Sequence, residues 1–321
     1  MNVVIGLDTS CYTTSVAALD EGGRVLASCR KLLPVPSGER GLRQSEAVFV
    51  HVRQLPQVME ELAPVLRREN ARICAVAASN APREGEDSYM PVFLAGSGHA
   101  RTLAAALGVP CYFFSHQQGH VAAGQIEHLK AWDARFTVLH ISGGTTDLLL
   151  SQEGQLTPVG GSLDLHAGQM VDRIGVAMGF GFPAGAALEQ LAMTCQESIR
   201  GLLPVSMARG DLQCHLSGAE SQCIRWLKAA AYPSELIAME TFDFLARTVA
   251  RLLAAGCAKS QTRQALVVGG VAASSLLREK VESRLKKAKS PIQVIFGRPE
   301  YSADNAAGIA LLGVQRHFKD R

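Results

Sequence analysis

Short hydrophobic runs alternate along the chain with longer stretches whose hydrophobic residues recur at helical spacing. Runs of strand length stand at 2–8, 73–79, 111–114, 136–142, 265–270 and 292–297. Helical spacing is clearest over 44–68, and further helices are expected at about 98–107, 115–132, 166–200, 219–231, 234–258, 274–288 and 304–318. This alternation, with glycine-rich turns between the elements, predicts the α/β class.

The order of elements at the N-terminus recurs near the middle of the chain. A strand, a turn of small residues and a returning strand occupy 3–19, and the same three elements occupy 136–151. Self-similarity of this kind indicates an internal duplication. We therefore expect two lobes of related architecture, one over residues 1–134 and one over 135–303. The last helix, within 304–321, is expected to pack back on the first lobe.

Composition narrows the class of protein. The chain has 321 residues, of which 47% are hydrophobic and 19% charged, so it can bury a large core and is too apolar to be disordered. The net charge of +3 does not indicate a strongly basic nucleic-acid binder, although it is compatible with a local basic patch. Eight cysteines without a C-x-x-C pair predict free thiols in a reducing cytosol.

No segment has the pattern of a membrane anchor or a signal peptide. Asp8 interrupts the apolar N-terminal run, which also lacks a positively charged flank. The longest apolar stretches are too short to span a bilayer. We therefore expect a cytoplasmic protein without membrane contact.

Three turns that follow buried strands are built from glycine or from small and hydroxyl-bearing residues, at 8–11, 142–146 and 269–271. Backbone N–H groups in such turns can approach a phosphate because no side chain blocks them. On this basis Thr9 and Ser10 are assigned to a phosphate turn, although one such turn alone is more often only a tight turn. The chain contains neither the P-loop pattern nor G-x-G-x-x-G, which argues against P-loop kinases and Rossmann enzymes.

His116 and His120 stand four residues apart in the sequence SHQQGH. A helix would place both imidazoles on one face, where they could be two ligands of one divalent metal, or merely solvated or capping histidines. Asp304 opens the last expected helix, where it could complete a two-histidine-one-carboxylate site or simply complement the helix dipole. A zinc protease is disfavoured because Gln117 stands where H-E-x-x-H has its glutamate.

Two further features have both a functional and a structural interpretation. Asp172 lies in an amphipathic stretch, where it could bond a ribose or lie on a solvated helix face. Basic residues gather at 280–289, and together with those of 316–321 they could contact RNA phosphate. A run of this kind is more often a solvated helix surface.

Seven motifs in a fixed order carry a resemblance to a known family. They are IGLDTSCYTTSVAALD, SHQQGH, HISGGTTDLLL, DLHAGQMVDRIGVAMGFGFPAGAAL, HLSGAESQ, VVGGVAASSLLRE and YSADNAAGIAL. From residue 3 to about residue 318 the chain resembles the TsaD family of tRNA N6-threonylcarbamoyladenosine synthases, once called sialoglycoprotein endopeptidases. The resemblance implies the two-lobed actin/sugar-kinase/Hsp70 fold (the actin-like ATPase fold), in which each lobe is a mixed β-sheet with flanking helices.

The resemblance also implies a reaction and its ligands. The family transfers a threonylcarbamoyl group from its adenylate to the N6 amine of the adenosine next to the tRNA anticodon, with AMP as the leaving group. One divalent metal ion, iron or zinc, would be held by His116, His120 and Asp304, and would polarise the acyl carbonyl of the donor. An ATP- or AMP-type nucleotide, or the threonylcarbamoyl adenylate itself, would contact His140, Ile141, Ser142, Gly143, Gly144, Asp172, Gly185 and Ser274.

Partners follow from the same resemblance. Bacterial members of the family act with an inactive homologue and a small ATPase, so partner proteins of this kind are implied besides tRNA, and a dimer is a further option. The net charge of +3 is too small to hold tRNA by general attraction. Binding of tRNA would therefore need the basic residues near the C-terminus or the surface of a partner.

The chain departs from the family pattern at several positions. Tyr12 and Thr13 replace two acidic residues of the first motif, Thr145 replaces a histidine, and Ser274 replaces an asparagine. The catalytic residues are therefore left unassigned. A second hypothesis is that the chain is a catalytically weakened paralogue, acting as a nucleotide-binding scaffold or regulator in a protein complex. A sugar or acetate kinase of the same fold is disfavoured, because the histidine pair has no role there.

Overall fold

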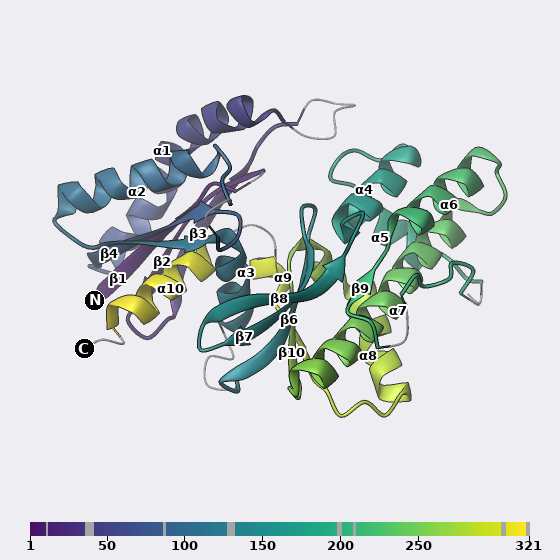
Figure 1. Ribbon diagram of the computed structural model, residues 1–321. Coiled ribbons are helices and arrows are strands. Elements are labelled where there is room, and N and C mark those ends of the chain that lie inside the picture. Colours follow the sequence, from purple (N-terminus) through teal and green to yellow (C-terminus); the bar gives the residue numbers. More distant parts are fainter. Residues whose placement is uncertain are drawn as a thin grey trace. The chain divides into compact units, whose positions relative to one another are not determined.

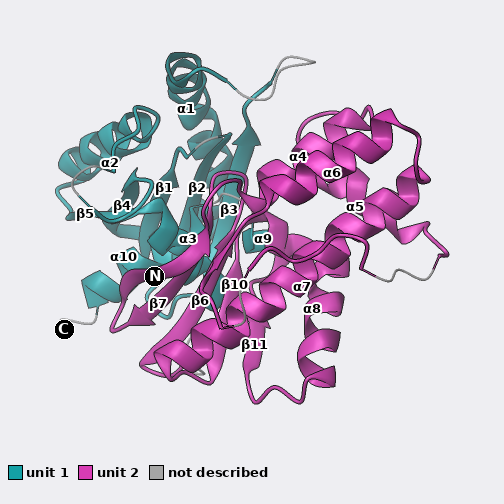
Figure 2. Cartoon of the chain, turned by 45° about the vertical axis from the view of Figure 1, so that its right-hand side comes forward, with its two compact units in different colours: residues 1–129, 300–321 teal, residues 130–299 magenta. Residues whose placement is uncertain are grey.

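The computed structural model forms two compact units, each built around one β-sheet. Unit 1 comprises residues 1–129 and 300–321, and unit 2 comprises residues 130–299 (Figure 2). The residues that it describes are 1–10, 12–35, 42–85, 88–126, 132–197, 201–207, 210–302 and 306–318. Within these ranges, no helix combines the length and the apolar character needed to cross a bilayer.

Unit 1 contains a five-stranded sheet whose central strand is the N-terminal one. Its elements are β1 (Asn2–Asp8), β2 (Thr13–Asp20), β3 (Val25–Leu32), α1 (Gln44–Arg68), β4 (Arg72–Ala81), α2 (Phe93–Leu107), β5 (Cys111–Ser115), α3 (His116–Gln125) and α10 (Ala307–Phe318). The strand order is β3-β2-β1-β4-β5. The strand β2 is antiparallel to both of its neighbours, β1 and β3, whereas β4 and β5 run parallel to β1.

Alternate residues of β1 face two different layers of helices. Val3, Ile5 and Leu7 pack with α1 and α2, whereas Val4 packs with α10. Figure 1 shows these two helical layers on opposite sides of the sheet. Because successive side chains of a strand point to opposite faces, a strand between two layers must be apolar on both. This is why the first strand reads as an unbroken hydrophobic run.

Unit 2 repeats this topology. Its elements are β6 (Arg135–Ile141), β7 (Thr146–Gln152), β8 (Gln155–Ser162), α4 (Ala167–Ala177), α5 (Gly185–Met193), β9 (Gln213–Cys214), α6 (Ser217–Lys228), α7 (Ser234–Ser260), β10 (Gln264–Val268), the 3-10 turn η1 (Gly270–Ala273), α8 (Ser275–Lys287) and β11 (Gln293–Phe296). The short helix α9 (Pro299–Ser302) begins at the last residue of unit 2 and continues into unit 1. The strand order is β11-β10-β6-β7-β8-β9. The strands β6, β7 and β8 form an antiparallel meander, and β10 and β11 run parallel to β6. The α/β class and the two opening hairpins are thus confirmed.

The long helix α7 forms the centre of the unit 2 core. Phe242, Phe244 and Leu252 on this helix are buried together with Leu139 of β6 and Leu148 of β7. The hydrophobic run of α7 is therefore covered on several sides, as is expected for a helix whose apolar residues are not confined to one stripe.

Several element boundaries differ from the sequence-based expectation. The helix expected over 166–200 is two helices, α4 and α5. Gly179 adopts a φ of +95°, and Pro183 lacks the N–H that a continuing helix needs. The helix α2 begins five residues earlier than expected, and α3 ends at Gln125 rather than at 132. The short strand β9 was not expected at all.

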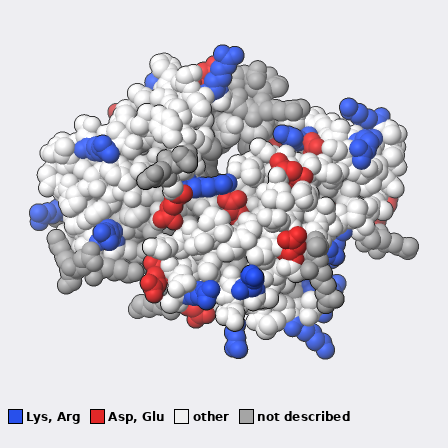
Figure 3. Space-filling view, in the orientation of Figure 1, with Lys and Arg blue, Asp and Glu red and all other residues white. Residues whose placement is uncertain are grey.

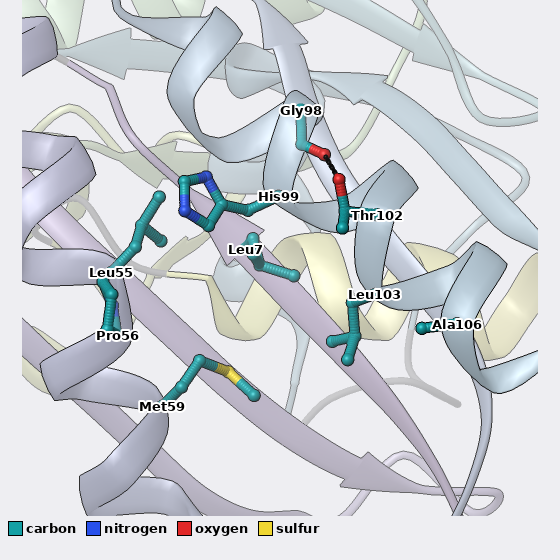
Figure 4. A pocket seen from close by; sticks show the side chains of 9 residues that line it. All are labelled: Leu7, Leu55, Pro56, Met59, Gly98, His99, Thr102, Leu103 and Ala106. Carbon is teal, nitrogen blue, oxygen red and sulfur yellow. Dashed lines mark hydrogen bonds between the residues drawn. The ribbon is translucent and has the colours of Figure 1, made fainter.

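A pocket of about 660 Å³ opens between α1 and α2. Figure 4 shows Leu7 of β1 between side chains of the two helices, with the Thr102 hydroxyl donating to the carbonyl of Gly98 at 3.0 Å. The lining residues are Leu7, Leu55, Pro56, Met59, Gly98, His99, Thr102, Leu103 and Ala106. Because Leu7 and Asp8 are successive strand residues, this pocket lies on the face of β1 opposite to the side chain of Asp8.

Candidate functional site

In unit 1, polar side chains meet where three parallel strands end. The strand β1 ends at Asp8, β4 carries Ser79 near its end, and β5 leads through Ser115 directly into α3 and His116. Parallel strands bring their carboxyl ends to the same edge of a sheet, which is where open α/β sheets usually bind ligands. The topology therefore gathers residues from three distant parts of the chain.

Asp8 is the centre of this cluster and is fully buried. The Ser10 hydroxyl donates to its Oδ2 at 2.6 Å, and the Ser79 hydroxyl donates to its Oδ1 at 2.5 Å. The Nδ1 atom of His116 lies 3.2 Å from the same Oδ1. A buried carboxylate is stable only when it is hydrogen-bonded or paired in this way. Neither Asp8 nor Ser79 was among the predicted site residues, although the position of Asp8 at the end of a buried strand is a usable signal.

The two histidines of α3 point their ring nitrogens at each other. The helix begins with a capping box, in which the Ser115 hydroxyl accepts from the N–H of Gln118 and the Gln118 side chain accepts from the N–H of Ser115. The Nε2 atoms of His116 and His120 are 3.0 Å apart. Both nitrogens can therefore bind one ion, since zinc–histidine bonds are about 2.0–2.1 Å long.

The third predicted ligand, Asp304, lies outside the described residues. Among the residues that are described, no group of three or more histidine, cysteine, aspartate and glutamate side chains is arranged to hold a metal ion. The donor chemistry of His116 and His120 fits a divalent metal, and the rest of the coordination shell remains a prediction.

The hydroxyls of Thr9 and Ser10 are used within unit 1. The Thr9 hydroxyl donates to the carbonyl of Val92 at 2.9 Å and accepts from the N–H of Gly96 at 3.0 Å, which ties the turn after β1 to the start of α2. A Cβ on Gly96 would lie 2.8 Å from that Thr9 oxygen, so the contact requires glycine. The Ser10 hydroxyl is bound to Asp8, as described above.

Tyr12 and Thr13, which stand where the family motif has two acidic residues, follow this turn. Thr13 is buried at the start of β2, where its N–H donates to the carbonyl of Ser10 at 3.1 Å. Tyr12 is half-buried, and its carbonyl accepts from the N–H of Leu33 at 2.8 Å. Neither residue supplies an acidic side chain to the cluster around Asp8.

In unit 2, the equivalent edge of the sheet carries the two glycine turns. The strand β6 runs into the turn at Ser142–Gly144, and the parallel strand β10 runs into Gly269. Gly269 has a φ of +99°, and a Cβ there would lie 2.3 Å from the carbonyl oxygen of Ile141. The backbones of the two strand ends are therefore in direct contact, and only glycine allows it.

A third glycine packs behind the first turn. The N–H of Gly168, at the start of α4, donates to the carbonyl of Ser142 at 3.0 Å, and a Cβ on Gly168 would lie 2.6 Å from the nitrogen of Gly143. In contrast, a Cβ on Gly143 or Gly144 would meet nothing within 4 Å. The turn is thus held from behind and has no side chain in front of Gly143 and Gly144, so an anion can approach its backbone. The N–H of Gly144 donates to the Ser142 hydroxyl at 3.3 Å.

His140 and Ile141 are buried at the end of β6. Ser274 and Gly185 lie at the starts of helices. The Ser274 hydroxyl caps α8 by accepting from the N–H of Leu277 at 3.1 Å. Gly185 is the first residue of α5.

Asp172, on α4, is hydrogen-bonded to the start of α5, because its Oδ1 accepts from the N–H of Ala184 at 2.8 Å. Burial raises the pKa of Asp172, and hydrogen bonds from the N–H groups of Ala184 and Gly185 counteract that rise.

Glu189 was missed by the sequence analysis. Its Oε1 accepts from the Ser275 hydroxyl and from the N–H of Leu276, both at 2.8 Å, so α5 supplies a carboxylate to the start of α8. This places a negative charge where the helix dipole favours one. No local sequence signal distinguishes Glu189 from an ordinary surface glutamate.

Asp164 ties the loop after β8 to the start of α6. Burial would raise the pKa of Asp164, but hydrogen bonds from the Ser217 hydroxyl and from the N–H groups of Leu216, Leu165 and Ser217 outweigh it and lower the pKa from 3.8 to about 2. Because the folded-state pKa lies below the unfolded value, ionised Asp164 stabilises the folded state above about pH 4, and this contribution is lost as the pH falls towards 2.

The substitution Asp164→Asn is therefore expected to lower the urea midpoint of unfolding at pH 6, and the difference from the unsubstituted protein should shrink between about pH 4 and pH 2. Asp211→Asn is the matched control, because Asp211 accepts from the N–H of Gln213 within an exposed turn. A difference between the two proteins that stays constant across this pH range would contradict the assignment.

Comparison with known proteins finds one family. The TsaD model, described as tRNA N6-adenosine threonylcarbamoyltransferase, matches residues 40–311. The tRNA N6-adenosine threonylcarbamoyltransferase of Aromatoleum aromaticum is 30% identical over 322 residues, which cover 98% of this chain and 91% of that protein. The probable bifunctional tRNA threonylcarbamoyladenosine biosynthesis protein of Methanothermobacter thermautotrophicus is 30% identical over 96% of this chain, but the match spans only 55% of that longer protein.

Comparison with solved structures concerns the fold alone. A ROK family glucokinase from Streptomyces griseus, solved with glucose and AMPPNP, aligns with a TM-score of 0.54 at 14% identity, covering 97% of this chain and 98% of that chain. It is a sugar kinase with the actin-like ATPase fold. The architecture expected from the sequence is thereby confirmed.

Proposed function

The chain belongs to the TsaD family of tRNA N6-adenosine threonylcarbamoyltransferases, and we propose that it is a transferase that modifies adenosine in tRNA. The observation that carries this proposal is the family match over residues 40–311, which spans both the histidine pair and the glycine turns. The finer proposal is that the group is threonylcarbamoyl, that its donor is the adenylate, and that the acceptor is the N6 amine of the adenosine next to the anticodon.

In the proposed step, the N6 amine attacks the acyl carbon of the donor. The new C–N bond forms as the bond from that carbon to the phosphate oxygen breaks, AMP leaves, and the amine loses one proton. AMP carries negative charge, so the glycine turn at Gly143 and Gly144, where no Cβ crowds the backbone, is suited to hold it. The nucleotide is proposed to contact the eight residues His140, Ile141, Ser142, Gly143, Gly144, Asp172, Gly185 and Ser274.

A divalent metal ion, iron or zinc, is proposed to bind His116 and His120, with Asp304 as a further ligand. When bound, such an ion supplies Lewis acidity towards an acyl carbonyl. The contribution of the chain is to hold the two imidazoles: α3 fixes their spacing, and the capping box at Ser115 fixes where the helix begins. The 3.0 Å separation of the Nε2 atoms supports this proposal.

Binding of tRNA is proposed to use basic residues of α8 together with a partner surface. Lys280 and Arg284 contact Asp243 within unit 2, which leaves Lys286, Lys287 and neighbouring positions exposed. On the face in Figure 3, the described acidic and basic side chains are interspersed in small groups. General attraction is therefore weak, and a cytoplasmic complex with an inactive homologue and a small ATPase, or a dimer, is proposed to complete the tRNA surface.

A second candidate function is a weakened paralogue that serves as a nucleotide-binding scaffold or regulator. The observation that favours it is that Tyr12 and Thr13 bring no acid to the cluster around Asp8. Such a protein would keep the glycine turns and bind nucleotide without transferring the group.

The two candidates are separated by measuring release of AMP from threonylcarbamoyl adenylate with and without unmodified tRNA. A transferase releases AMP faster when tRNA is present, beyond the spontaneous hydrolysis measured without protein. A scaffold binds the nucleotide, but its addition leaves the tRNA-dependent rate at the background value. That second outcome would refute the transferase proposal.

Gly168→Ala is expected to lower the rate of tRNA-dependent AMP release by about 100-fold. The new methyl group would lie against the backbone of Gly143 and push the turn away from the position in which it holds the donor. Gly181→Ala is the matched control, since a Cβ there meets nothing within 4 Å. Equal rates for the two variants would show that the glycine turn does not hold the leaving group.

A further inference from the structure

We propose that Asp8 is a positioning residue for the metal site of unit 1. Its carboxylate accepts the Nδ1 proton of His116 and thereby keeps the Nε2 atom of that ring as the metal-binding nitrogen. This inference rests on the metal part of the proposed function and extends it to a residue outside the proposed ligand set. Asp8 itself is not a metal ligand.

The position of the proton on His116 decides which ring nitrogen can bind a metal. A neutral imidazole carries one proton, so one ring nitrogen donates and the other offers a lone pair. The Nδ1 atom lies 3.2 Å from the Oδ1 atom of Asp8, and an ionised carboxylate only accepts hydrogen bonds. The proton therefore belongs on Nδ1, and the lone pair on Nε2 is directed towards the Nε2 atom of His120, 3.0 Å away.

Asp8 is itself held rigidly. Hydroxyls of Ser10 and Ser79 donate to its two oxygens, at 2.6 and 2.5 Å, and the carboxylate is fully buried. The neighbouring Thr9 is tied to Val92 at the start of α2, so the backbone after Asp8 is fixed as well. A carboxylate anchored from both sides can determine the orientation of the imidazole that it contacts.

Metal-binding histidines usually donate their second ring nitrogen to a carboxylate or carbonyl, and loss of that partner typically weakens metal binding by about 10–100-fold. The carboxylate also raises the basicity of the ligating nitrogen. The Asp8–His116 pair has this geometry, with the acid on β1 and the ligand on α3.

The first test is zinc affinity, measured by chelator competition on the metal-depleted full chain without tRNA or donor. Asp8→Asn is expected to weaken zinc binding by about 10–100-fold. Asp8→Glu, which keeps a carboxylate, is expected to recover most of the affinity. Asp20→Asn is the matched control in the same sheet, where Asp20 binds the N–H groups of Gly22 and Arg24 at an exposed turn, and its affinity should equal that of the unsubstituted protein.

A second measurement does not depend on whether a variant folds. Nitrogen-15 spectroscopy of the zinc-loaded, histidine-labelled protein should show the proton of His116 on Nδ1. A proton on Nε2 of His116, or a folded Asp8→Asn variant with unchanged zinc affinity, would overturn the proposal. Because neither measurement involves tRNA, a negative transferase assay leaves this test unaffected.

Discussion

Gly308→Ala is expected to destabilise unit 1 by about 3 kcal/mol, at the upper end of the usual cost of overpacking. Gly308 lies near the start of α10, where a Cβ would be 1.8 Å from the carbonyl oxygen of Gly119 and 2.7 Å from the nitrogen of Ala123. Both neighbours are backbone atoms of α3, so no side chain can rotate to make room. The helices α10 and α3 must therefore move apart, which displaces His116 and His120.

The measurement is the free energy of unfolding from urea titrations, together with zinc affinity of the folded variant. Gly98→Ala is the matched control, because it lies inside α2 and a Cβ there meets nothing within 4 Å. A helix-interior alanine at Gly98 should stabilise by about 0.5–1 kcal/mol. If Gly308→Ala unfolds at the same urea concentration as the unsubstituted protein, α10 does not pack on α3 as described.

Arg247→Ala is expected to destabilise unit 2 by about 3–5 kcal/mol, the range found when one partner of a buried ion pair is removed. The Arg247 guanidinium contacts Glu240 Oε1 at 2.6 Å and Asp243 Oδ2 at 2.9 Å, and it donates to the carbonyl of Leu203 at 2.6 Å. Glu240 is fully buried, and its Oε2 has no hydrogen-bond partner among the residues that the structure describes. Without the guanidinium, that carboxylate is buried without a compensating charge.

The same variant has an expected pH dependence. Burial raises the pKa of Glu240, and the charge of Arg247 opposes that rise, so removing the arginine moves the folded-state pKa further above the unfolded value. The contribution of Glu240 to stability is then largest below its unfolded pKa and is lost as the pH rises through the folded-state pKa. The loss of unfolding free energy caused by Arg247→Ala should therefore be smaller at pH 5 than at pH 8.

Arg24→Ala is the control for Arg247→Ala. Arg24 contacts Asp20 at 3.0 Å, but its side chain is 66% exposed, and exposed pairs of this kind contribute at most about 1 kcal/mol. Urea titrations of both variants at the two pH values make the comparison. Equal losses for the two arginines would mean that the charge network around Glu240 is not buried in solution.

The duplicated core of the fold could be predicted from the sequence. Two apolar runs separated by small residues are a local signal, and it occurs at the start of each unit in the strands β1–β2 and β6–β7. The helical spacing of α1 and α7 is likewise local. The break between α4 and α5 was missed because apolar periodicity continues across it, whereas Gly179 and Pro183 end the helix.

The contacts of the candidate site could be predicted only in part. The spacing of His116 and His120 is visible within one helix, but Asp8 is 108 residues away from His116 in the sequence. Their contact depends on β1, β4 and β5 being parallel neighbours, and a single sequence does not determine strand order. Gly168 shows a similar limit, because nothing nearby in the chain reveals that its missing Cβ leaves room for Gly143.

The most direct test of the account is mass spectrometry of nucleosides from unmodified tRNA treated with this protein, the threonylcarbamoyl adenylate and accessory proteins of the family. The Aromatoleum aromaticum relative, supplied with the same components, serves as the positive control. We expect an adenosine that carries a threonylcarbamoyl group at N6. Unmodified adenosine alone, under conditions in which the control modifies the tRNA, would contradict it.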